Sequence, residues 1–334
     1  MTSKERIQRA VSYQEVDRAP AGLFGTHIEY EEGLAEFIGV NSVEAMYREL
    51  GVDIWHSKVS LEYNGPGNIL GVLEDHPHPF AHMTTIDEVE AFRVPDIEEF
   101  DDTKLVAHLQ EHQDFAVCGG INSAIYHHYL GMCGQENGLC FLKLQPEVAK
   151  AMIRRITDFW VAWLRKVLEA GVGMIDIIEN CNDFGTQRSM FISADDFREF
   201  FKPQLSRLYD TTKAYGVLYM QPSCGSIGPI IEDFIEMGAD ILNPIQVEAN
   251  DMDIEDLVGK YKGRITFYGG IDTQQLLPHG PEKKIKGEVD KLNGLFGNGG
   301  GLILGGSQGL LEDIPYEHAV AMLEENLDWH TRRS

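Results

Sequence analysis

Short apolar runs alternate with longer amphipathic stretches along most of this chain. An apolar run of about five residues followed by a helical pattern is the βα unit of a parallel sheet. We predict eight strands, at residues 19–24, 53–57, 114–118, 174–178, 217–220, 239–242, 265–268 and 301–304. Eight such units make a closed barrel. The pattern therefore predicts an α/β protein with a (β/α)8 TIM-barrel fold.

The clearest predicted helix runs from Pro146 to Ala170. Its apolar positions recur at spacings of three and four and include Val148, Met152, Ile156, Phe159 and Trp163. Ser193 and the acidic residues after it predict the start of a helix over 197–215, and a last helix is expected over 315–329. Residues 63–100 are irregular and rich in glycine and proline, which indicates an N-terminal insertion. Without a linker or repeat, one domain over 1–334 is the simplest interpretation.

Composition narrows the class of protein. The 334 residues are 43% hydrophobic, enough for a large core, and 53 acidic against 28 basic residues give a formal net charge of −25. Such an acidic surface disfavours nucleic acid and anionic membranes as partners. There is no apolar run of the ~18 residues that a membrane span needs, and the N-terminus lacks a signal-peptide pattern. Five cysteines without a CxxC pair indicate a reducing compartment, so we expect a cytoplasmic protein.

Two polar residues stand where predicted strands end. Cys224 follows the run at 217–220, within Gln221-Pro222-Ser223-Cys224-Gly225-Ser226-Ile227, and Glu179 directly follows the run at 174–178. The loops at the C-terminal ends of barrel strands form the active site in barrel enzymes. We therefore expect both side chains to face the barrel mouth, where burial would suit Glu179 to acid–base chemistry. The alternative for Cys224 is a small buried apolar side chain.

Five ordered motifs extend this pattern over nearly the whole chain: Glu15-Val16-Asp17-Arg18-Ala19-Pro20, Asn182-Asp183-Phe184-Gly185-Thr186-Gln187, Pro222-Ser223-Cys224-Gly225-Ser226-Ile227, Ile241-Leu242-Asn243-Pro244-Ile245-Gln246 and Gly269-Gly270-Ile271-Asp272-Thr273-Gln274. Together they resemble the uroporphyrinogen decarboxylase superfamily, and within it the cobalamin-dependent methyltransferase branch. The resemblance implies a (β/α)8 barrel with its site in the C-terminal mouth. Because one fold hosts several chemistries, it implies function less directly.

The decarboxylases of this superfamily recognise a tetrapyrrole with many carboxylates through an arginine-rich loop after the first strand. The corresponding stretch here, residues 22–30, has no arginine and contains Glu29. Bidentate recognition of carboxylates needs the guanidinium. The resemblance also places His127 where the decarboxylases have a tyrosine, and Gln308 where they have a histidine. The alternative function is therefore a decarboxylase of a different carboxylated substrate.

In zinc-containing methyltransferases of the superfamily, a His-x-Cys and a later Cys or His bind the metal. Cys224 is present here, but Pro222 and Gln308 occupy the other ligand positions. The familiar zinc site is incomplete. A rearranged site, with Cys224 beside Glu179, His127 or Cys118, is an open alternative, since thiolate, carboxylate and imidazole all bind zinc.

We predict a methyltransferase that moves a methyl group between a small O- or N-methylated substrate and the cobalt of a separate corrinoid protein, so that cobalamin is carried by this partner. A barrel that serves only as a binding scaffold is the non-enzyme alternative, and a homodimer is left open. Asp183 has an alternative as a turn cap. The candidate catalytic residues are Glu179, His127 and Asp183; the candidate substrate-binding residues are Asn122, Phe24, His27, Tyr126, Phe184, Asn243, Gln246 and Gln308; the candidate zinc ligands are Cys224 and Glu179.

Overall fold

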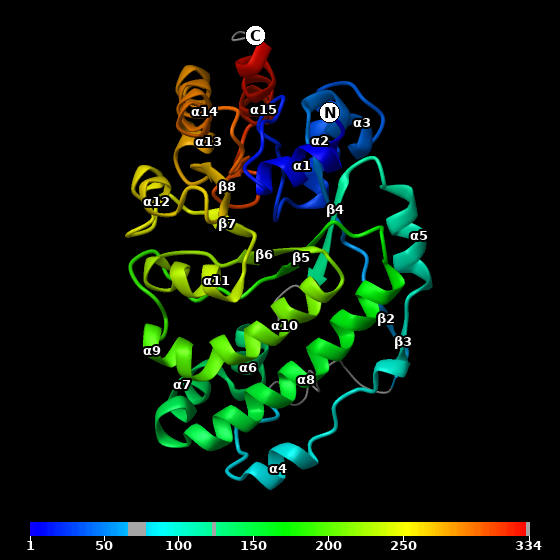
Figure 1. The fold of residues 1–334 in the computed structure, drawn as a ribbon, viewed down its shortest axis with the longest axis vertical. Coiled ribbons are helices and arrows are strands. Elements are labelled where there is room, and N and C mark those ends of the chain that lie inside the picture. The colour runs from blue at the N-terminus through cyan, green and yellow to red at the C-terminus, as the bar shows by residue number, and fades with distance from the viewer. Residues whose placement is uncertain (66–77, 122–124, 332–334) are drawn as a thin grey trace.

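The computed structural model describes residues 1–65, 78–121 and 125–331. Seven parallel strands form one curled sheet in the order β1-β4-β5-β6-β7-β8-β9 (Figure 1). The strands are β1 (Ile54–His56), β4 (Ala116–Ile121), β5 (Ile177–Asn180), β6 (Leu218–Pro222), β7 (Ile241–Ile245), β8 (Thr266–Ile271) and β9 (Leu302–Gly306). The prediction of an α/β barrel-type fold is confirmed.

Ala21 occupies the eighth position of the sheet. It forms isolated parallel bridges to Val52, which leads into β1, and to Leu304 of β9. The Asp53 amide donates to the Ala21 carbonyl at 2.8 Å, and the Leu304 amide donates to the Pro20 carbonyl at 2.8 Å. The sheet thus closes through a single residue. The predicted regular strand over 19–24 is wrong in this respect, because Pro20 has no N–H to contribute to a ladder.

Most strands lie one to three residues further along the chain than the apolar runs predicted. The run at 174–178 becomes β5, which ends at Asn180, and the run at 114–118 becomes β4, which ends at Ile121. Glycines and polar side chains extend these two strands beyond the apolar runs: Gly119 and Gly120 in β4, and Glu179 and Asn180 in β5. They remain in the ladder, so hydrophobicity marks the strand ends poorly.

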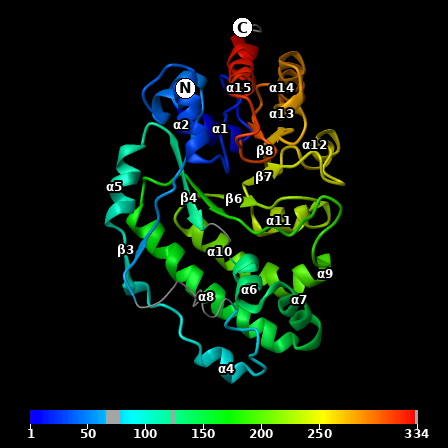
Figure 2. The ribbon, with the colours of Figure 1, turned by 180° about the vertical axis from the view of Figure 1, so that it is seen from behind.

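Helices surround the sheet, and α8 and α10 run side by side along one flank, with α14 and α15 together at the opposite end (Figures 1 and 2). The predicted helix from Pro146 to Ala170 is confirmed as α8. The predicted helix over 197–215 is confirmed as α10, which continues from α9 through a π-helical turn, η3 (Phe197–Phe201). The helices are α1 (Ser3–Val11), α2 (Ile28–Phe37), α3 (Val43–Leu50), α4 (Ile86–Ala91), α5 (Thr103–Glu111), α6 (Ile125–Cys133), α7 (Gln135–Leu144), α8 (Pro146–Ala170), α9 (Ala194–Asp196), α10 (Lys202–Ala214), α11 (Ile231–Met237), α12 (Ile254–Tyr261), α13 (Leu276–His279), α14 (Glu282–Phe296) and α15 (Tyr316–Thr331), with 3-10 turns η2 (Ile97–Glu99) and η4 (Gly228–Ile230). Among the described helices, none is long and apolar enough to cross a membrane.

Helix α1 covers the end of the barrel where the strands begin. Its Ile7 is fully buried and belongs to the cluster inside the barrel, which comprises Ile7, Ile54, Ala116, Cys118, Ile177, Met220, Ile241, Tyr268 and Ile303. A second, larger core fills the space between the sheet and the surrounding helices. Since α1 occupies the end where the strands begin, a ligand reaches the barrel interior from the end where the strands finish.

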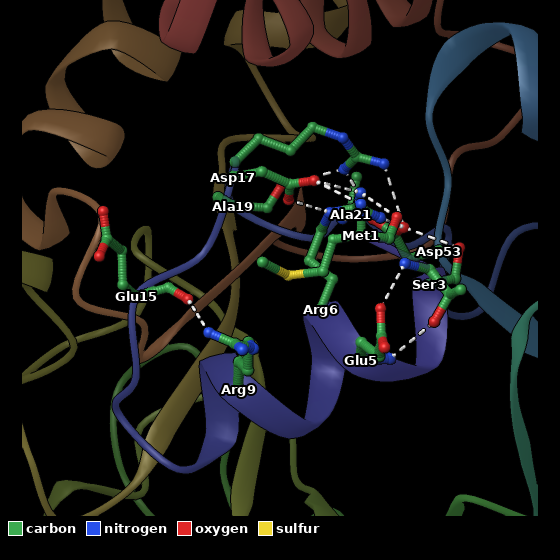
Figure 3. Close-up of polar contacts among 12 residues, drawn as sticks. Met1, Ser3, Glu5, Arg6, Arg9, Glu15, Asp17, Ala19, Ala21 and Asp53 are labelled. Atoms are coloured by element: carbon green, nitrogen blue, oxygen red, sulfur yellow. Dashed lines mark hydrogen bonds and ion pairs between the residues drawn. The ribbon is translucent and has the colours of Figure 1, made fainter. Parts of the chain in front are cut away.

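A buried carboxylate fixes α1 to the barrel (Figure 3). Asp53, fully buried just before β1, accepts from Arg6 Nη1 at 2.5 Å and from Arg18 Nη1 at 2.7 Å. It also accepts from the Ala21 amide at 3.0 Å. Arg6 in turn pairs with Asp17 at 2.7 Å. The Asp17-Arg18 motif therefore places Ala21 at the point where the barrel closes.

The irregular insertion is bounded by a small two-stranded sheet. Strand β2 (Glu62–Tyr63) pairs antiparallel with β3 (Phe100–Asp101), and α4 lies between them in the sequence. In the described part of this segment, residues 63–65 and 78–100, the elements are short, as the sequence predicted. Residues 66–77 lie outside the described part of the chain.

Candidate functional site

A cavity of about 530 Å³ opens at the C-terminal ends of the strands. We call it the mouth cavity. Its walls come from the loop after Ala21, the segment after β1, the ends of β4 and β5, and helix α8. It is lined by Leu23, Phe24, Gly25, Thr26, His56, Ser57, Lys58, Val59, Ser60, Leu61, Gly120, Trp160, Trp163, Glu179 and Cys181. Its volume lies in the range of small-molecule sites, roughly 300–1,000 Å³.

Three ligand-type side chains converge at the base of this cavity. Oε2 of Glu179 lies 3.3 Å from Nδ1 of His56 and 3.4 Å from Sγ of Cys118. Their strands are neighbours, with His56 paired to Cys118 in the ladder and Glu179 paired to Gly120. Side chains alternate along a strand, so each of the three lies on the same face as the barrel-interior residue two positions before it. Glu179, which the sequence led us to expect in the mouth, lines the mouth cavity.

Tyr268, on β8, orients the His56 ring. Its hydroxyl lies 3.1 Å from His56 Nε2 and accepts from the Phe24 amide at 3.0 Å. The Phe24 ring packs edge-on against both His56 and Tyr268. Because Tyr268 holds Nε2, the Nδ1 atom of His56 is turned toward Glu179. Phe24, predicted to contact substrate, thus both supports this cluster and lines the mouth cavity.

Burial controls the protonation of Cys118. The thiol is almost fully buried, and this burial raises its pKa well above the usual value, with the nearby Glu179 carboxylate adding to the effect. As a neutral thiol, Cys118 donates to Glu179 Oε2. Position 120, two residues after Cys118, requires glycine, because a Cβ there would lie 1.9 Å from the Glu179 carbonyl oxygen.

The walls of the mouth cavity are aromatic and poor in free positive charge. Trp160 and Trp163 of α8 form part of one wall. Lys58 also lines the cavity, but its Nζ pairs with the buried Glu31 carboxylate at 2.9 Å and donates to the Thr26 carbonyl at 3.2 Å. Among the described residues that line the cavity there is no arginine. A substrate with many carboxylates would find no guanidinium here.

A second cavity of about 470 Å³, which we call the side cavity, gathers four of the predicted residues, Tyr126, His127, Asp183 and Cys224. It is lined by His78, Tyr126, His127, Leu130, Gly131, Gln135, Asp183, Gly185, Phe191 and Cys224. His127 Nε2 lies 3.8 Å from Asp183 Oδ2, and the Cys224 amide donates to Asp183 Oδ1 at 2.9 Å. Sequence reasoning expected these residues to share one cavity with Glu179. Glu179 lines the mouth cavity instead, and Cys181, which also lines the mouth cavity, connects the two by donating to Asp183 Oδ1 at 3.6 Å.

Cys224 is surrounded in a way that does not suit zinc. Gln308 Nε2 lies 2.7 Å from its sulfur and donates to it. Burial raises the pKa of the Cys224 thiol to about 12, and the charge of Asp183 adds to this shift. Pro222 has no donor atom in its side chain. The zinc site that the resemblance implies does not fit these residues, so we derive no chemistry through a metal there.

The motif residues around Cys224 hold two loops together. Gly225 has φ +79°, and a Cβ there would lie 2.6 Å from the carbonyl carbon of Gly185. Gln246 accepts from the Gly225 amide at 2.7 Å, and Ser223 accepts from the Phe184 amide at 3.1 Å. Asp183 Oδ1 accepts from the Cys224 amide on the other loop, whereas the turn-cap alternative expected a contact within its own turn at Phe184-Gly185. These contacts brace the mouth.

The remaining predicted residues differ in their placement. Tyr126 is buried beside the side cavity, and its hydroxyl has no hydrogen-bond partner among the described residues. Phe184 is fully buried in a cluster of aromatic rings and lines neither cavity. Asn243 is fully buried, and both polar atoms of its side chain have no partner in the described structure. His27 is exposed before α2 and also lines neither cavity, and Asn122 lies outside the described residues.

Sequence reasoning missed His56, Trp160 and Trp163 as residues of the site. The alternation of side chains along β1 could have indicated His56, because Ile54 faces the barrel interior and His56, two positions later, lies on the same face. The two tryptophans carried no such signal, because their spacing in α8 resembled an ordinary core-facing stripe.

Two groups among the described residues have the composition and spacing of metal ligands: His56, Cys118 and Glu179, and a second group on and beside α5, His108, Glu111 and His112. The histidines of the second group already contact Trp55. Trp55 Nε1 donates to His108 Nε2 at 3.2 Å, and the Trp55 ring stacks on His112. Cys224 belongs to neither group. Of the two predicted zinc ligands, Glu179 therefore lies in a ligand-type cluster, and Cys224 does not.

The structure is thus an α/β barrel with a cavity of small-molecule size at its mouth. Comparison with known proteins identifies it further: residues 45–327 match the model of the family described as Uroporphyrinogen decarboxylase (URO-D), so the chain belongs to this family. The chain is 25% identical over 187 residues to a uroporphyrinogen decarboxylase of Chlorobium limicola, covering 54% of this chain and 49% of that protein. It is 23% identical over 173 residues to one from Thermus thermophilus, covering 52% and 46%. The chain thus matches about half the length of these curated relatives.

A solved methyltransferase from Methanosarcina mazei has a similar fold, with a TM-score of 0.65 and 17% sequence identity, covering 99% of both chains. At this level of identity the likeness concerns the fold. The predicted family is confirmed. The activity has to be argued from the residues of the site.

Proposed function

We propose that this protein is a methyltransferase that moves a methyl group between a small O- or N-methylated substrate and the cobalt of a corrinoid protein. The observation that carries the proposal is the mouth cavity, which is aromatic, contains no arginine, and has the Glu179 carboxylate at its base. Aromatic walls bind a methylated ring or a methylammonium group well. The fold likeness to a methyltransferase is consistent with this function.

In the demethylating direction, the cobalt(I) centre attacks the methyl carbon of the substrate. A cobalt–carbon bond forms, the carbon–oxygen or carbon–nitrogen bond breaks, and cobalt is oxidised from the I to the III state. The electron pair of the broken bond stays on the oxygen or nitrogen, which takes up a proton if it leaves as an anion. The protein must hold the methyl carbon in line with cobalt and stabilise the leaving atom.

We assign the leaving-group contact to Glu179, with His56 beside it, because both line the mouth cavity. His127 and Asp183 line the side cavity, so we give them a role in shaping the mouth through the Cys224 loop. The cobalamin macrocycle would be presented at the open end of the barrel by a separate protein, with the small substrate bound beneath it. All five cysteines are free, which is consistent with the cytoplasmic location we propose.

The alternative is a decarboxylase of the family type that acts on a different carboxylated substrate. The names of the curated relatives favour it. The unpartnered amide of Asn243 is a feature that could face such a substrate. Against it stands the charge of the mouth cavity, where the cationic side chain of Lys58 is already paired with Glu31.

Chemically reduced cob(I)alamin provides a direct test without the native partner. The full chain is incubated with it and a panel of methoxylated aromatics and methylamines, and methylcobalamin is followed by its absorbance. We expect at least one substrate to be demethylated, and Glu179→Gln to lower the rate by about 10²-fold or more. The matched control is Glu324→Gln on the exposed face of α15, which should leave the rate unchanged.

Release of CO2 from a carboxylated compound, without methyl transfer from any donor, would replace the proposal by the decarboxylase alternative. A wild-type rate of demethylation in Glu179→Gln would leave the proposed function standing but would contradict the role of Glu179 as the leaving-group contact.

A further inference from the structure

We propose that His56, Cys118 and Glu179 form a zinc site at the base of the mouth cavity, displaced from the position around Cys224. The three residues lie on three adjacent strands: His56 ends β1, Cys118 is in the middle of β4, and Glu179 precedes the last residue of β5. Imidazole nitrogen, thiolate sulfur and carboxylate oxygen together are a donor set typical of Zn²⁺. The site is thus built from rigid elements rather than from loops.

The spacing of the donor atoms matches a tetrahedral ion. Zinc bonds of about 2.0–2.3 Å at tetrahedral angles separate neighbouring ligand atoms by roughly 3.3–3.6 Å. Glu179 Oε2 lies 3.3 Å from His56 Nδ1 and 3.4 Å from Cys118 Sγ. All three donor atoms lie within 4.8 Å of one another. An ion can therefore be accommodated with small side-chain adjustments.

His56 is oriented as a metal ligand would be. Its Nδ1 atom is buried and makes no hydrogen bond within the described structure, although it points at the cluster. Its other nitrogen, Nε2, is held by the Tyr268 hydroxyl at 3.1 Å. Histidine ligands of metals commonly have a second partner of this kind on the opposite nitrogen, which fixes the ring and its tautomer. Tyr268 is thus a positioning residue for the site.

The cluster also leaves room for a substrate atom. His56 and Glu179 line the mouth cavity, and the Glu179 side chain is 24% exposed, while Cys118 is almost fully buried beneath them. Three protein ligands with a fourth position open to a cavity is the arrangement of catalytic zinc. The role of the ion depends on the proposed function: it would polarise the oxygen or nitrogen that loses the methyl group.

Metal content of the purified full chain tests the site without any substrate. We expect stoichiometric zinc by mass spectrometry, and strong loss of zinc in Cys118→Ser and Glu179→Gln, which keep the shape of the side chains. Cys224→Ser and Cys181→Ser are the matched controls and should retain the metal. After removal of zinc by a chelator, Co²⁺ should bind with a thiolate-to-cobalt charge-transfer band that is absent in Cys118→Ser. Tyr268→Phe should weaken Co²⁺ binding by about 10- to 100-fold.

Zinc that is retained in Cys118→Ser but lost in Cys224→Ser would overturn the site, as would loss only in His112→Ala. A folded wild-type chain that binds neither Zn²⁺ nor Co²⁺ would also overturn it. Methyl transfer by metal-free protein, unaffected by the chelator, would leave the proposed function standing and remove the zinc. Zinc bound at these residues without methyl transfer to cob(I)alamin would leave the zinc site standing and remove the proposed function.

Discussion

The side-chain amide of Gln308 donates to the sulfur of Cys224 at 2.7 Å, across the loops that follow β6 and β9. This contact occupies the thiol that the sequence marked as the centre of the site. The ligand-type cluster of the mouth instead lies on β1, β4 and β5. The thiol that the resemblance assigns to metal binding thus takes part in a contact between two loops.

The first prediction concerns the reactivity of Cys224. Burial raises the pKa of its thiol to about 12, and the charge of Asp183 adds to this, while the Gln308 amide opposes it. Since the thiolate is the reactive form, Asp183→Asn should speed alkylation of Cys224 at pH 8, and Gln308→Leu should slow it. Mass spectrometry of iodoacetamide-treated protein measures both, with the exposed Cys140 as an internal reference. Equal rates in all three proteins would contradict the prediction.

Asp53 is predicted to be a major contributor to stability. It is fully buried and accepts from Arg6 and Arg18. Asp53→Asn removes the buried charge that Arg18 and Arg6 share and leaves Arg6 with Asp17 alone, so the free energy of unfolding should fall by about 3–5 kcal/mol. Denaturant unfolding measures this. Asp114→Asn breaks only the exposed pair with Arg48 and should have little effect; similar losses in both variants would refute the role of the buried network.

Glu248 is predicted to make stability depend on pH. Burial, reinforced by the hydrogen bond with Asp272, raises the pKa of Glu248 to about 7 from 4.5. Between these values the folded protein holds a proton that the unfolded chain has released, so the free energy of unfolding falls as pH rises through this window. The pKa of Asp272 is lowered from 3.8, outside the window.

Glu248→Gln mimics the protonated carboxyl and should flatten this dependence. We expect a Tm about 2–4 °C above that of the wild type at pH 8, and no gain at pH 5. Thermal unfolding at both pH values checks this, with Glu324→Gln as the exposed control. A gain at pH 5 as large as that at pH 8 would point to a cause other than titration.

Gly225→Ala should disrupt the contact between the two mouth loops. The added Cβ would lie 2.6 Å from backbone atoms of Gly185, in addition to the cost of φ +79°. Gly216→Ala is a matched control, since φ is +70° there but no atom lies within 4 Å of the new Cβ. The control should lose about 1 kcal/mol of stability, and Gly225→Ala clearly more. Equal losses would mean that the loops can separate without cost.

Much of the fold was predictable because it depends on local pattern. The spacing of apolar residues in α8 predicted its bounds correctly, and seven of the eight predicted strands became regular strands. The strand ends were displaced because Glu179 and Asn180 stay in the β5 ladder although they are polar. The site was only partly predictable: Glu179 was placed correctly in the mouth, whereas His127, Asp183 and Cys224 gathered in the side cavity.

By itself, the sequence determined the barrel, the family and the absence of an arginine-rich loop after the first strand, because these depend on periodicity and on residue types at ordered motifs. The tertiary structure decided which side chains meet. Glu179 lies beside His56 and Cys118 because their strands are neighbours in a closed sheet and their side chains share its inner face. Residues 61 and 123 positions apart in the chain, such as Cys118 and His56 from Glu179, come within hydrogen-bond or ion-pair distance only through that closure.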